Sequence, residues 1–181
     1  MPILIDTRNA VPEDASAIAE VFYQAWLSTY PNEEHGVTVD DILYRYRQRH
    51  SPTSVCRRVA EYKNLDTGVT MRVATHGRRV VGVCRMSHDT ERNQLEAIYL
   101  LPRYTHKSIG LVLFYESLLL HNESLPIVVH VATYNMAAIS FYMKLGFVGT
   151  GRTFADPKFK LHSGAIIPKL EMVLDPRPAP S

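Results

Sequence analysis

Two apolar segments joined by a short polar turn, at residues 95–115, constrain the fold most. The sequence LEAIYL at residues 95–100 predicts a strand, Pro102 ends it, and an apolar helix follows from Ser108 to about residue 121. Glu116 is the only Asp, Glu, Lys or Arg of that helix. Because a helix that is apolar all round is stable only when it is buried, the fold must pack it against other elements.

The turn before this helix, at residues 105–110, has the features of an anion site. The first backbone N–H groups of a helix have no partner within the helix and lie at the positive end of its dipole. Lys107 adds a full positive charge beside them. The turn therefore favours a phosphate, although the same pattern also suits a plain connection between a strand and a helix.

Periodicity along the rest of the chain predicts an α/β fold with the element order β-αα(α)-β-β-β-α-β-α-β-β. This order describes a mixed central sheet of about seven strands flanked by helices, with an antiparallel start and a parallel centre. With 181 residues, we expect one domain over residues 1–174 and a flexible Pro-rich tail at 175–181. The strands are expected at residues 3–8, 69–74, 79–86, 95–100, 126–132, 147–154 and 166–174. The helices are expected at residues 12–30, 39–50, 52–63, 108–121 and 136–145.

The composition of the chain does not indicate a particular class of binding partner. A net charge of +2 with 21% charged residues gives no global attraction to nucleic acid or to membranes. The first residues, MPILIDTRNAV, lack the basic and apolar regions of a secretory signal, so we expect a cytoplasmic protein. Cys56 and Cys84 have no CxxC spacing and the histidines show no ligand spacing, so we expect neither a disulfide nor a metal.

Two segments, IYLLPRYTHKSIG and NMAAISFYMKLGF, resemble the signature motifs of the GCN5-related N-acetyltransferases, the GNAT superfamily. The resemblance extends over nearly the whole chain. The first segment departs from the family's Gln/Arg-x-x-Gly-x-Gly/Ala pattern. Thr105 replaces the Gln or Arg, Ser108 replaces the first Gly, Gly110 is kept, and His106 stands where many members have glycine. The second segment matches the family at Asn135, Ala138, Phe141, Tyr142, Lys144, Gly146 and Phe147.

The resemblance implies a GNAT-like sheet that binds acetyl-CoA as a cosubstrate, with the pyrophosphate of coenzyme A in the glycine-poor turn. The hydroxyl of Ser108 can donate to a phosphate, but its side chain restricts φ, so we expect weaker affinity than for an all-glycine turn. The residues expected to contact coenzyme A are Ile98, Tyr99, Leu100, Thr105, His106, Lys107, Ser108, Ile109, Gly110, Leu111, Asn135, Ala138 and Tyr142.

For catalysis, the resemblance implies Tyr142 as the general acid that protonates the departing thiolate and Glu96 as the general base that takes the ammonium proton. A pKa of about 10 keeps a phenol protonated at neutral pH. Strand alternation predicts that the side chains of Glu96, Ile98 and Leu100 share one face. The resemblance implies that the backbone N–H of Leu100 stabilises the oxyanion. A core aromatic at Tyr142 and a solvated strand charge at Glu96 are the simpler alternatives.

Charge in the first quarter of the chain suggests the acceptor. Glu33 and Glu34, unlike the other acidic pairs there, do not start a helix. They lie where the family builds its acceptor loop, near Trp26 and Tyr30, and an acidic aromatic site suits a cationic amine. We expect a polyamine-like small molecule or a protein or peptide amine, with a merely solvated loop as the alternative. Nucleic acid is disfavoured, because the basic residues at 44–50 would surround a helix.

Together these residues predict an N-acetyltransferase in which a primary amine attacks the thioester of acetyl-CoA directly. The alternative is a catalytically degenerate GNAT-like domain that binds CoA or acyl-CoA as a sensor or scaffold. Thr105 and Ser108 favour this alternative, whereas Tyr142 and Glu96 argue against it. The resemblance is also compatible with a homodimer, because dimers are common in the family.

Overall fold

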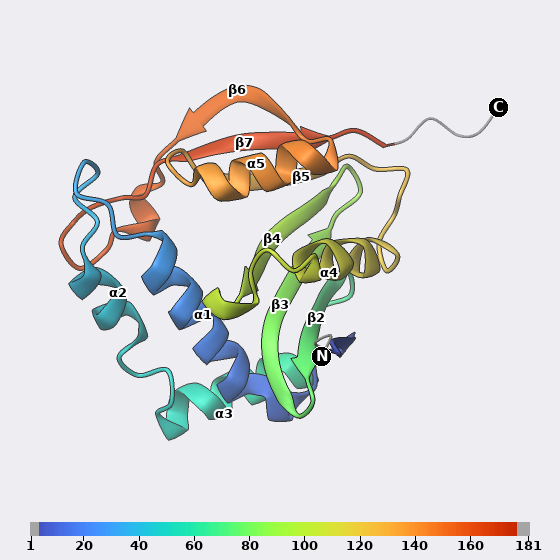
Figure 1. Cartoon of the computed structure of the whole chain (residues 1–181), viewed down its shortest axis with the longest axis horizontal. Helices are drawn as coiled ribbons and strands as arrows, with labels where there is room; N and C mark the ends of the chain where they lie inside the picture. Colours follow the sequence, from blue (N-terminus) through green and yellow to red (C-terminus); the bar gives the residue numbers. More distant parts are fainter. Residues whose placement is uncertain (1–3, 177–181) are drawn as a thin grey trace.

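One mixed sheet with the strand order β1-β2-β3-β4-β5-β7-β6 organises the computed structural model, which describes residues 4–176 (Figure 1). The strands are β1 (Asp6–Asn9), β2 (Val69–His76), β3 (Arg79–His88), β4 (Asn93–Leu100), β5 (Ile127–Ala132), β6 (Val148–Phe154) and β7 (Lys169–Leu174). The helices are α1 (Ala15–Thr29), α2 (Val39–Tyr46), α3 (Pro52–Lys63), α4 (Ile109–Leu118) and α5 (Met136–Leu145), with short 3-10 helices at Pro12–Asp14, Pro102–Tyr104 and Pro157–Phe159. The predicted order of elements and the fold class are confirmed.

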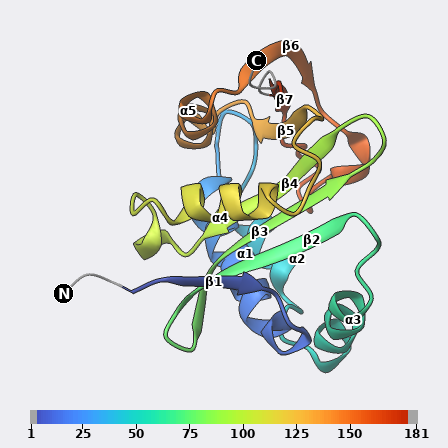
Figure 2. The same ribbon diagram turned by 90° about the vertical axis from the view of Figure 1, so that its right-hand side faces the viewer.

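The helices cover the two faces of the sheet unequally. Helices α1, α2 and α3 lie on one side, and α4 and α5 lie on the other (Figure 2). Helix α4 packs one side on the sheet, where Leu113 and Phe114 are fully inaccessible to solvent against β2 and β3, whereas Leu111, Val112 and Tyr115 on its other side are exposed. The apolar helix predicted after the turn therefore forms, but the expectation that it is buried on all sides was wrong, because the sheet covers only one side of it.

Several element boundaries differ from the prediction; among the strands, β2 and β3 end two residues later than expected and β4 begins two residues earlier. Helix α2 ends at Tyr46 and not at residue 50; Arg47 and Arg49 lie in turns that follow it, and their guanidinium groups donate to the carbonyls of Tyr44 and Tyr46. Helix α4 ends at Leu118 and not at residue 121. Strand β7 begins after Pro168, whose nitrogen has no hydrogen to donate to the ladder. Of the tail expected at 175–181, only residues 175 and 176 are described.

Strands β4 and β5 pair only at their beginnings. The parallel register runs from Asn93 with Ile127 to Leu95 with Val129, and beyond that pair the two strands separate. Strand β5 instead continues against β7 through Ala132. The sheet is therefore open between the second halves of its two central strands.

A β-bulge in β4 lies at the start of this opening. Arg85 of β3 faces Ala97 and the next residue, Met86, faces Leu95, so Glu96 is an extra residue in β4. Its carboxylate bonds to Arg85 and Ser87 on the α3 side of the sheet, whereas Ile98 and Leu100 pack toward α4. The expectation that Glu96, Ile98 and Leu100 share one face was wrong, because the bulge interrupts the alternation of side chains.

No helix within residues 4–176 has both the length and the apolar character needed to cross a bilayer. The same residues contain no group of three or more His, Cys, Asp or Glu side chains placed to bind one metal ion.

Gly82 of β3 tests how tightly the wall of the opening is packed. A Cβ at position 82 would lie 2.4 Å from Leu100 Cδ2 and 3.1 Å from Leu113 Cδ1. We expect Gly82→Ala to lower the free energy of unfolding by about 1 to 3 kcal/mol, because Leu100 must move toward the opening. Gly149→Ala is the control, since nothing lies within 4 Å of the corresponding position. Urea unfolding of both variants measures the effect, and equal stability would contradict this packing.

Candidate active site

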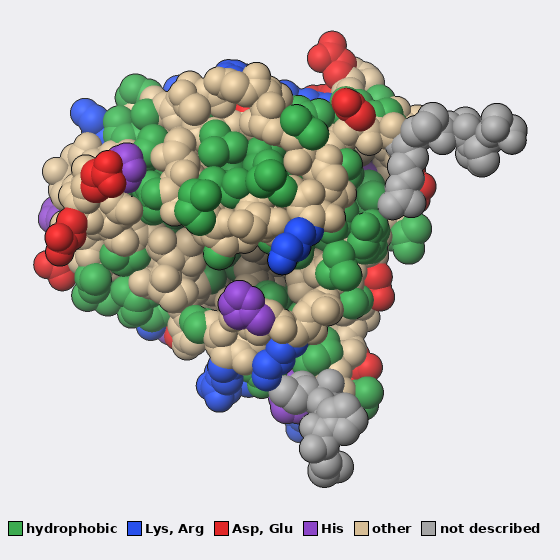
Figure 3. Space-filling model, turned by 45° about the horizontal axis from the view of Figure 1, so that its top comes forward, with side chains coloured by type: hydrophobic (Ala, Val, Ile, Leu, Met, Phe, Trp, Pro, Cys, Tyr) green, Lys and Arg blue, Asp and Glu red, His purple; other side chains and the backbone are tan. Residues whose placement is uncertain are grey.

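A cavity of about 830 Å³ occupies the opening between β4 and β5. Its walls come from β4, the turn before α4, the first residues of α4, helix α5 and the end of α1. Figure 3 shows this face of the molecule hollowed, with basic and histidine side chains at the rim of the hollow. Every residue expected to contact coenzyme A lines the cavity, and so do Glu96 and Tyr30. Residues from distant parts of the sequence therefore meet at the place where the sheet splits.

The turn before α4 has the left-handed backbone conformation that favours glycine, although His106 and Ser108 occupy the left-handed positions. His106 has φ +59° and Ser108 has φ +60°, both in the left-handed region, while Lys107 between them has a negative φ. Backbone of alternating handedness turns successive N–H groups toward one side, which forms a concave anion site. The serine and histidine side chains restrict φ, as expected, but they do not prevent this conformation.

The backbone donors of this turn are available. From His106 to Leu111, no N–H group donates to a backbone carbonyl within residues 4–176, and the first helical bond is that of Val112 N–H to Ser108 O. Lys107 lies beside these donors with its side chain exposed, and its Nζ is 5.6 Å from the centre of the Tyr104 ring. Free N–H groups, a helix dipole and a lysine together suit a multiply charged phosphate group.

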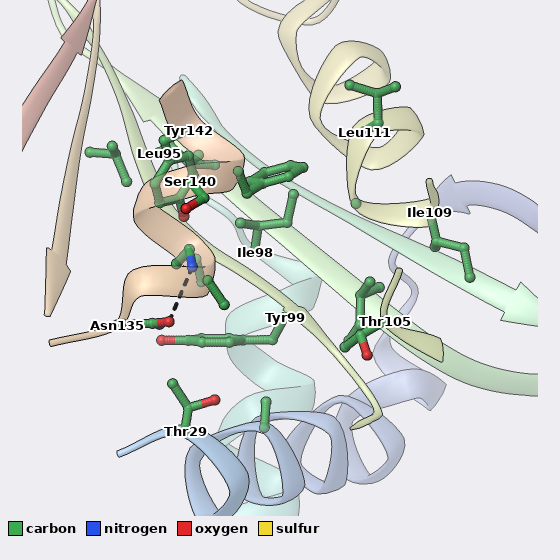
Figure 4. Close-up of a pocket in the computed structure, with 18 of the residues that line it drawn as sticks. Thr29, Leu95, Ile98, Tyr99, Thr105, Ile109, Leu111, Asn135, Ser140 and Tyr142 are labelled. Carbon is green, nitrogen blue, oxygen red and sulfur yellow. Dashed lines mark hydrogen bonds between the residues drawn. The ribbon is translucent and has the colours of Figure 1, made fainter. Parts of the chain in front are cut away.

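The open edge of β4 supplies further donors. Leu101 N–H donates to Val81 O, so the backbone of this residue is bonded to β3. Because successive residues of a strand direct their N–H groups to opposite sides, the N–H groups of Leu100 and Ile98 point away from β3 and toward the cavity. Ile98 and Tyr99 stand between the α5 residues and the turn in Figure 4. This edge can hold an extended chain by its amide groups and can donate to an oxyanion.

Asn135 is the residue before α5, and its side chain caps this helix. Its Oδ1 accepts the N–H of Ala138 at 3.1 Å, as the dashed line in Figure 4 shows. At the other end of α5, Gly146 has φ +99°, the left-handed conformation that favours glycine after a helix. These two residues fix the helix that carries Tyr142.

Tyr142 is buried at the inner end of the cavity. Its side chain is 7% exposed and packs beside the rings of Phe141 and Phe147. Burial raises the pKa of the Tyr142 phenol well above 10, and the nearby Tyr99 and Cys84 raise it further. The phenol is therefore a proton donor throughout the neutral range.

Glu96 is held by two donors at the apex of the opening. Arg85 Nε donates to Glu96 Oε2 at 2.6 Å, and Ser87 Oγ donates to Glu96 Oε1 at 2.6 Å. Arg85 also pairs with Glu61 of α3 through Nη1 at 2.7 Å. Glu96 is thus a positioned carboxylate and not a freely solvated one.

The residues expected to bind the acceptor are not gathered at the cavity. Tyr30 lines it, and its hydroxyl is 3.0 Å from that of Tyr99. Trp26 does not line it, and the guanidinium of Arg45 already lies 4.6 Å from the centre of its ring. Glu33 and Glu34 are exposed in the turn between Asn32 and Val37, outside the cavity wall.

Sequence reasoning missed His130, which lines the cavity from β5. Its Nε2 lies 3.2 Å from Glu171 Oε2 on the neighbouring strand β7. Burial lowers the pKa of His130 below 6.5, against the opposing effect of Glu171, so the imidazole is neutral at neutral pH. A sequence signal for this residue was present, because His130 is the only polar residue in the buried strand IVVHVA.

A family model described as the Acetyltransferase (GNAT) family matches residues 20–147. The chain belongs to this family. As a GNAT protein it is an N-acetyltransferase whose cosubstrate is acetyl-CoA. The cavity suits that cosubstrate, because it combines free N–H donors for a pyrophosphate with the open edge of β4 for an amide-containing arm.

Relatives of this GNAT protein include a curated sequence and several solved structures. The spermidine N(1)-acetyltransferase of Thermoplasma acidophilum is 26% identical over 147 residues, which cover 79% of this chain and 88% of the relative. The PaiA N-acetyltransferase structure from the same organism, in complex with coenzyme A, has a TM-score of 0.71 at 22% identity and covers 95% of this chain and 99% of its own. The ribosomal-protein-S18-alanine N-acetyltransferase of Escherichia coli has a TM-score of 0.66 at 14% identity and covers 98% and 97%.

The left-handed conformation at position 108 can be tested by stability. Ser108→Gly removes the clash of a Cβ in that region, whereas Ser124→Gly changes a loop serine whose φ is negative. Both variants gain the same unfolded-state freedom, so the difference between them isolates the backbone strain. We expect Ser108→Gly to be more stable than Ser124→Gly by about 1 to 2 kcal/mol in urea unfolding. An equal decrease in the free energy of unfolding in the two variants would show that the backbone at Ser108 is unstrained.

Proposed function

We propose that this GNAT protein transfers the acetyl group of acetyl-CoA to a primary amine by direct attack, with Tyr142 as general acid and Glu96 as general base. In this proposal the turn from Thr105 to Leu111 holds the pyrophosphate of coenzyme A. The observation that carries the proposal is that all these residues line one cavity at the split between β4 and β5.

In the transfer step, the amine nitrogen forms a bond to the carbonyl carbon of the thioester, and the carbon–sulfur bond breaks. The acceptor ammonium first gives a proton to Glu96, directly or through a water, because only a neutral amine is nucleophilic. The carbonyl oxygen takes up negative charge and accepts a hydrogen bond from Leu100 N–H, which faces the cavity. The departing thiolate takes the proton of Tyr142, and the resulting phenolate regains a proton from the acylated nitrogen, which must lose its second proton to become the neutral amide.

The two ionisable groups have environments that suit these roles. Burial keeps the Tyr142 phenol protonated, so its hydroxyl is available as a hydrogen-bond and proton donor to the thiolate as it leaves. Glu96 is held between Arg85 and Ser87 and lines the cavity, where an ammonium can approach its carboxylate. Tyr142 and Glu96 both line the cavity, and we propose that the thioester carbonyl lies between them.

For the acceptor, we propose a primary amine of a small cationic molecule or of a protein or peptide. Polyamines come first among small molecules to test, because one relative is named a spermidine N-acetyltransferase. A protein N-terminus comes second, because a structural neighbour is named as an acetyltransferase of a ribosomal protein alanine. Of the side chains expected to bind the acceptor, we assign only Tyr30 to contact with it, because Tyr30 lines the cavity whereas Glu33 and Glu34 lie outside the cavity wall.

Isothermal titration of the full chain with acetyl-CoA and with free CoA tests the proposal first. We expect saturable binding of both, followed by acetylation of at least one amine from a panel of polyamines, amino acids and short peptides. Binding of CoA with no turnover of any amine would favour a sensor or scaffold in place of an enzyme. No binding of either ligand would overturn the assignment of the turn to the pyrophosphate.

Replacement of Tyr142 tests the general acid. Tyr142→Phe removes only the hydroxyl, so we expect kcat to fall by about 100-fold or more while the Kd for acetyl-CoA changes little. The control is Tyr115→Phe on the exposed side of α4. The raised pKa of Tyr142 also predicts that the wild-type kcat does not fall from ionisation of this phenol as the pH passes 10. An unchanged kcat in Tyr142→Phe would remove the residue from the mechanism.

A further inference from the structure

A second cavity of about 340 Å³ lies on the α1 and α3 side of the sheet. Helix α1 provides an apolar wall, α3 provides charged and aromatic side chains, and the sheet forms the floor. Its charged lining residues are Arg58, Glu61, Arg85 and Glu96. None of the residues that we assign to the cofactor lines this cavity.

The two cavities meet at the bulge in β4. Glu96 and Ala97 line both of them, and the pairing of β4 with β5 ends one residue earlier, at Leu95. The second cavity therefore lies across the proposed base from the pyrophosphate turn. Within the reaction site, the carboxylate of Glu96 is therefore the group nearest to a molecule bound in the second cavity.

One end of the second cavity is negatively charged. The guanidinium of Arg85 lies between two carboxylates, with Nε 2.6 Å from Glu96 Oε2 and Nη1 2.7 Å from Glu61 Oε1. Two carboxylates for one guanidinium leave a net charge of about −1 at this end. An ammonium group is the natural complement to it.

The other charged group of the cavity, Arg58, has no carboxylate partner. Within residues 4–176 it forms no ion pair, its Nε is buried without an acceptor, and one Nη donates to the carbonyl of Arg49. Burial lowers the pKa of Arg58, as expected for a cation with little compensation. The Nε itself is closed to solvent and to a ligand, but Arg58 lines the cavity, and an anion bound there gives this cation the charge partner that it lacks within residues 4–176.

Arg58 and Glu61 are close enough to contact one small molecule. They are three residues apart on α3, which puts them on the same side of the helix with Cβ atoms about 5 to 6 Å apart. The cavity thus presents a carboxylate pair and an unpaired guanidinium at short separation. Ile18, Phe22 and Met71 supply apolar surface between them.

We infer that the second cavity is the acceptor site and that it takes a compact amino-carboxylate, such as an α-amino acid with an apolar side chain. This inference rests on the proposed function and narrows its acceptor. The ammonium lies against Glu96 and Glu61, and the carboxylate accepts from the planar guanidinium of Arg58. A polyamine fits this cavity less well, because a second ammonium would meet Arg58 where the carboxylate is expected.

Matched acceptors test the inference by steady-state kinetics with acetyl-CoA. The pairs are leucine with isopentylamine and phenylalanine with 2-phenylethylamine, which differ only in the carboxylate, and spermidine is the polycation. We expect kcat/KM for each amino acid to exceed that for its decarboxylated partner by about 10- to 100-fold. Arg58→Gln should raise KM for the amino acids by a similar factor and leave the simple amines unchanged. Arg57→Gln, the exposed neighbour outside the cavity, should keep the preference.

Direct titration of leucine and spermidine into the wild-type chain, with and without CoA, keeps the test independent of turnover and of the folding of the variants. Saturable binding of leucine that does not require CoA supports the inference even if the proposed transfer fails. Preference for isopentylamine or spermidine over leucine overturns the inference while the proposed transfer stands. An unchanged amino-acid preference in a folded Arg58→Gln variant also overturns it.

Discussion

The early end of pairing between β4 and β5 is the constraint on which the site depends. A central pair of parallel strands would ordinarily continue and bury its backbone groups in hydrogen bonds. Here the register stops at Leu95 and Val129, and the bulge at Glu96 turns β4 away from β5. The backbone of β4 beyond this point therefore faces a cavity and is available to a ligand. The same bulge brings Glu96 to the α3 side, where two cavities meet.

The turn before α4 shows that a left-handed backbone conformation can form without glycine. A glycine-rich loop reaches left-handed conformations at little energetic cost, and this chain reaches them at His106 and Ser108. The surrounding elements hold the turn in place, since Pro102 and Tyr104 form a short helix before it and α4 is buried behind it. Anion binding needs the positions of the N–H groups, and these positions depend on φ and ψ and not on the absence of a side chain.

The acidic residues that stand out in the sequence differ from those that line the cavities of the folded protein, so the two point to different acceptor sites. In the sequence, Glu33 and Glu34 stand out because no helix start explains them. In space they are exposed and lie outside both cavities, whereas Glu61 and Glu96 lie at the junction of the cavities through their shared partner Arg85. The aromatic residue expected to attract a cation, Trp26, is already covered by Arg45. Local pairs formed on folding decide which charges remain available to a ligand.

Periodicity and capping residues determined most of the architecture. The order of elements, the cap at Thr38 with Asp41, the cap at Asn135 and the glycine after α5 were all readable from the chain, because they depend on contacts between near neighbours. The set of residues around the cofactor turn was readable for the same reason, since strand, turn and helix are contiguous. The bulge at Glu96, the pairing of His130 with Glu171 and the isolation of Arg58 were decided only by tertiary structure. Each depends on which distant strand or helix packs beside the residue, and a local sequence pattern carries no information about that neighbour.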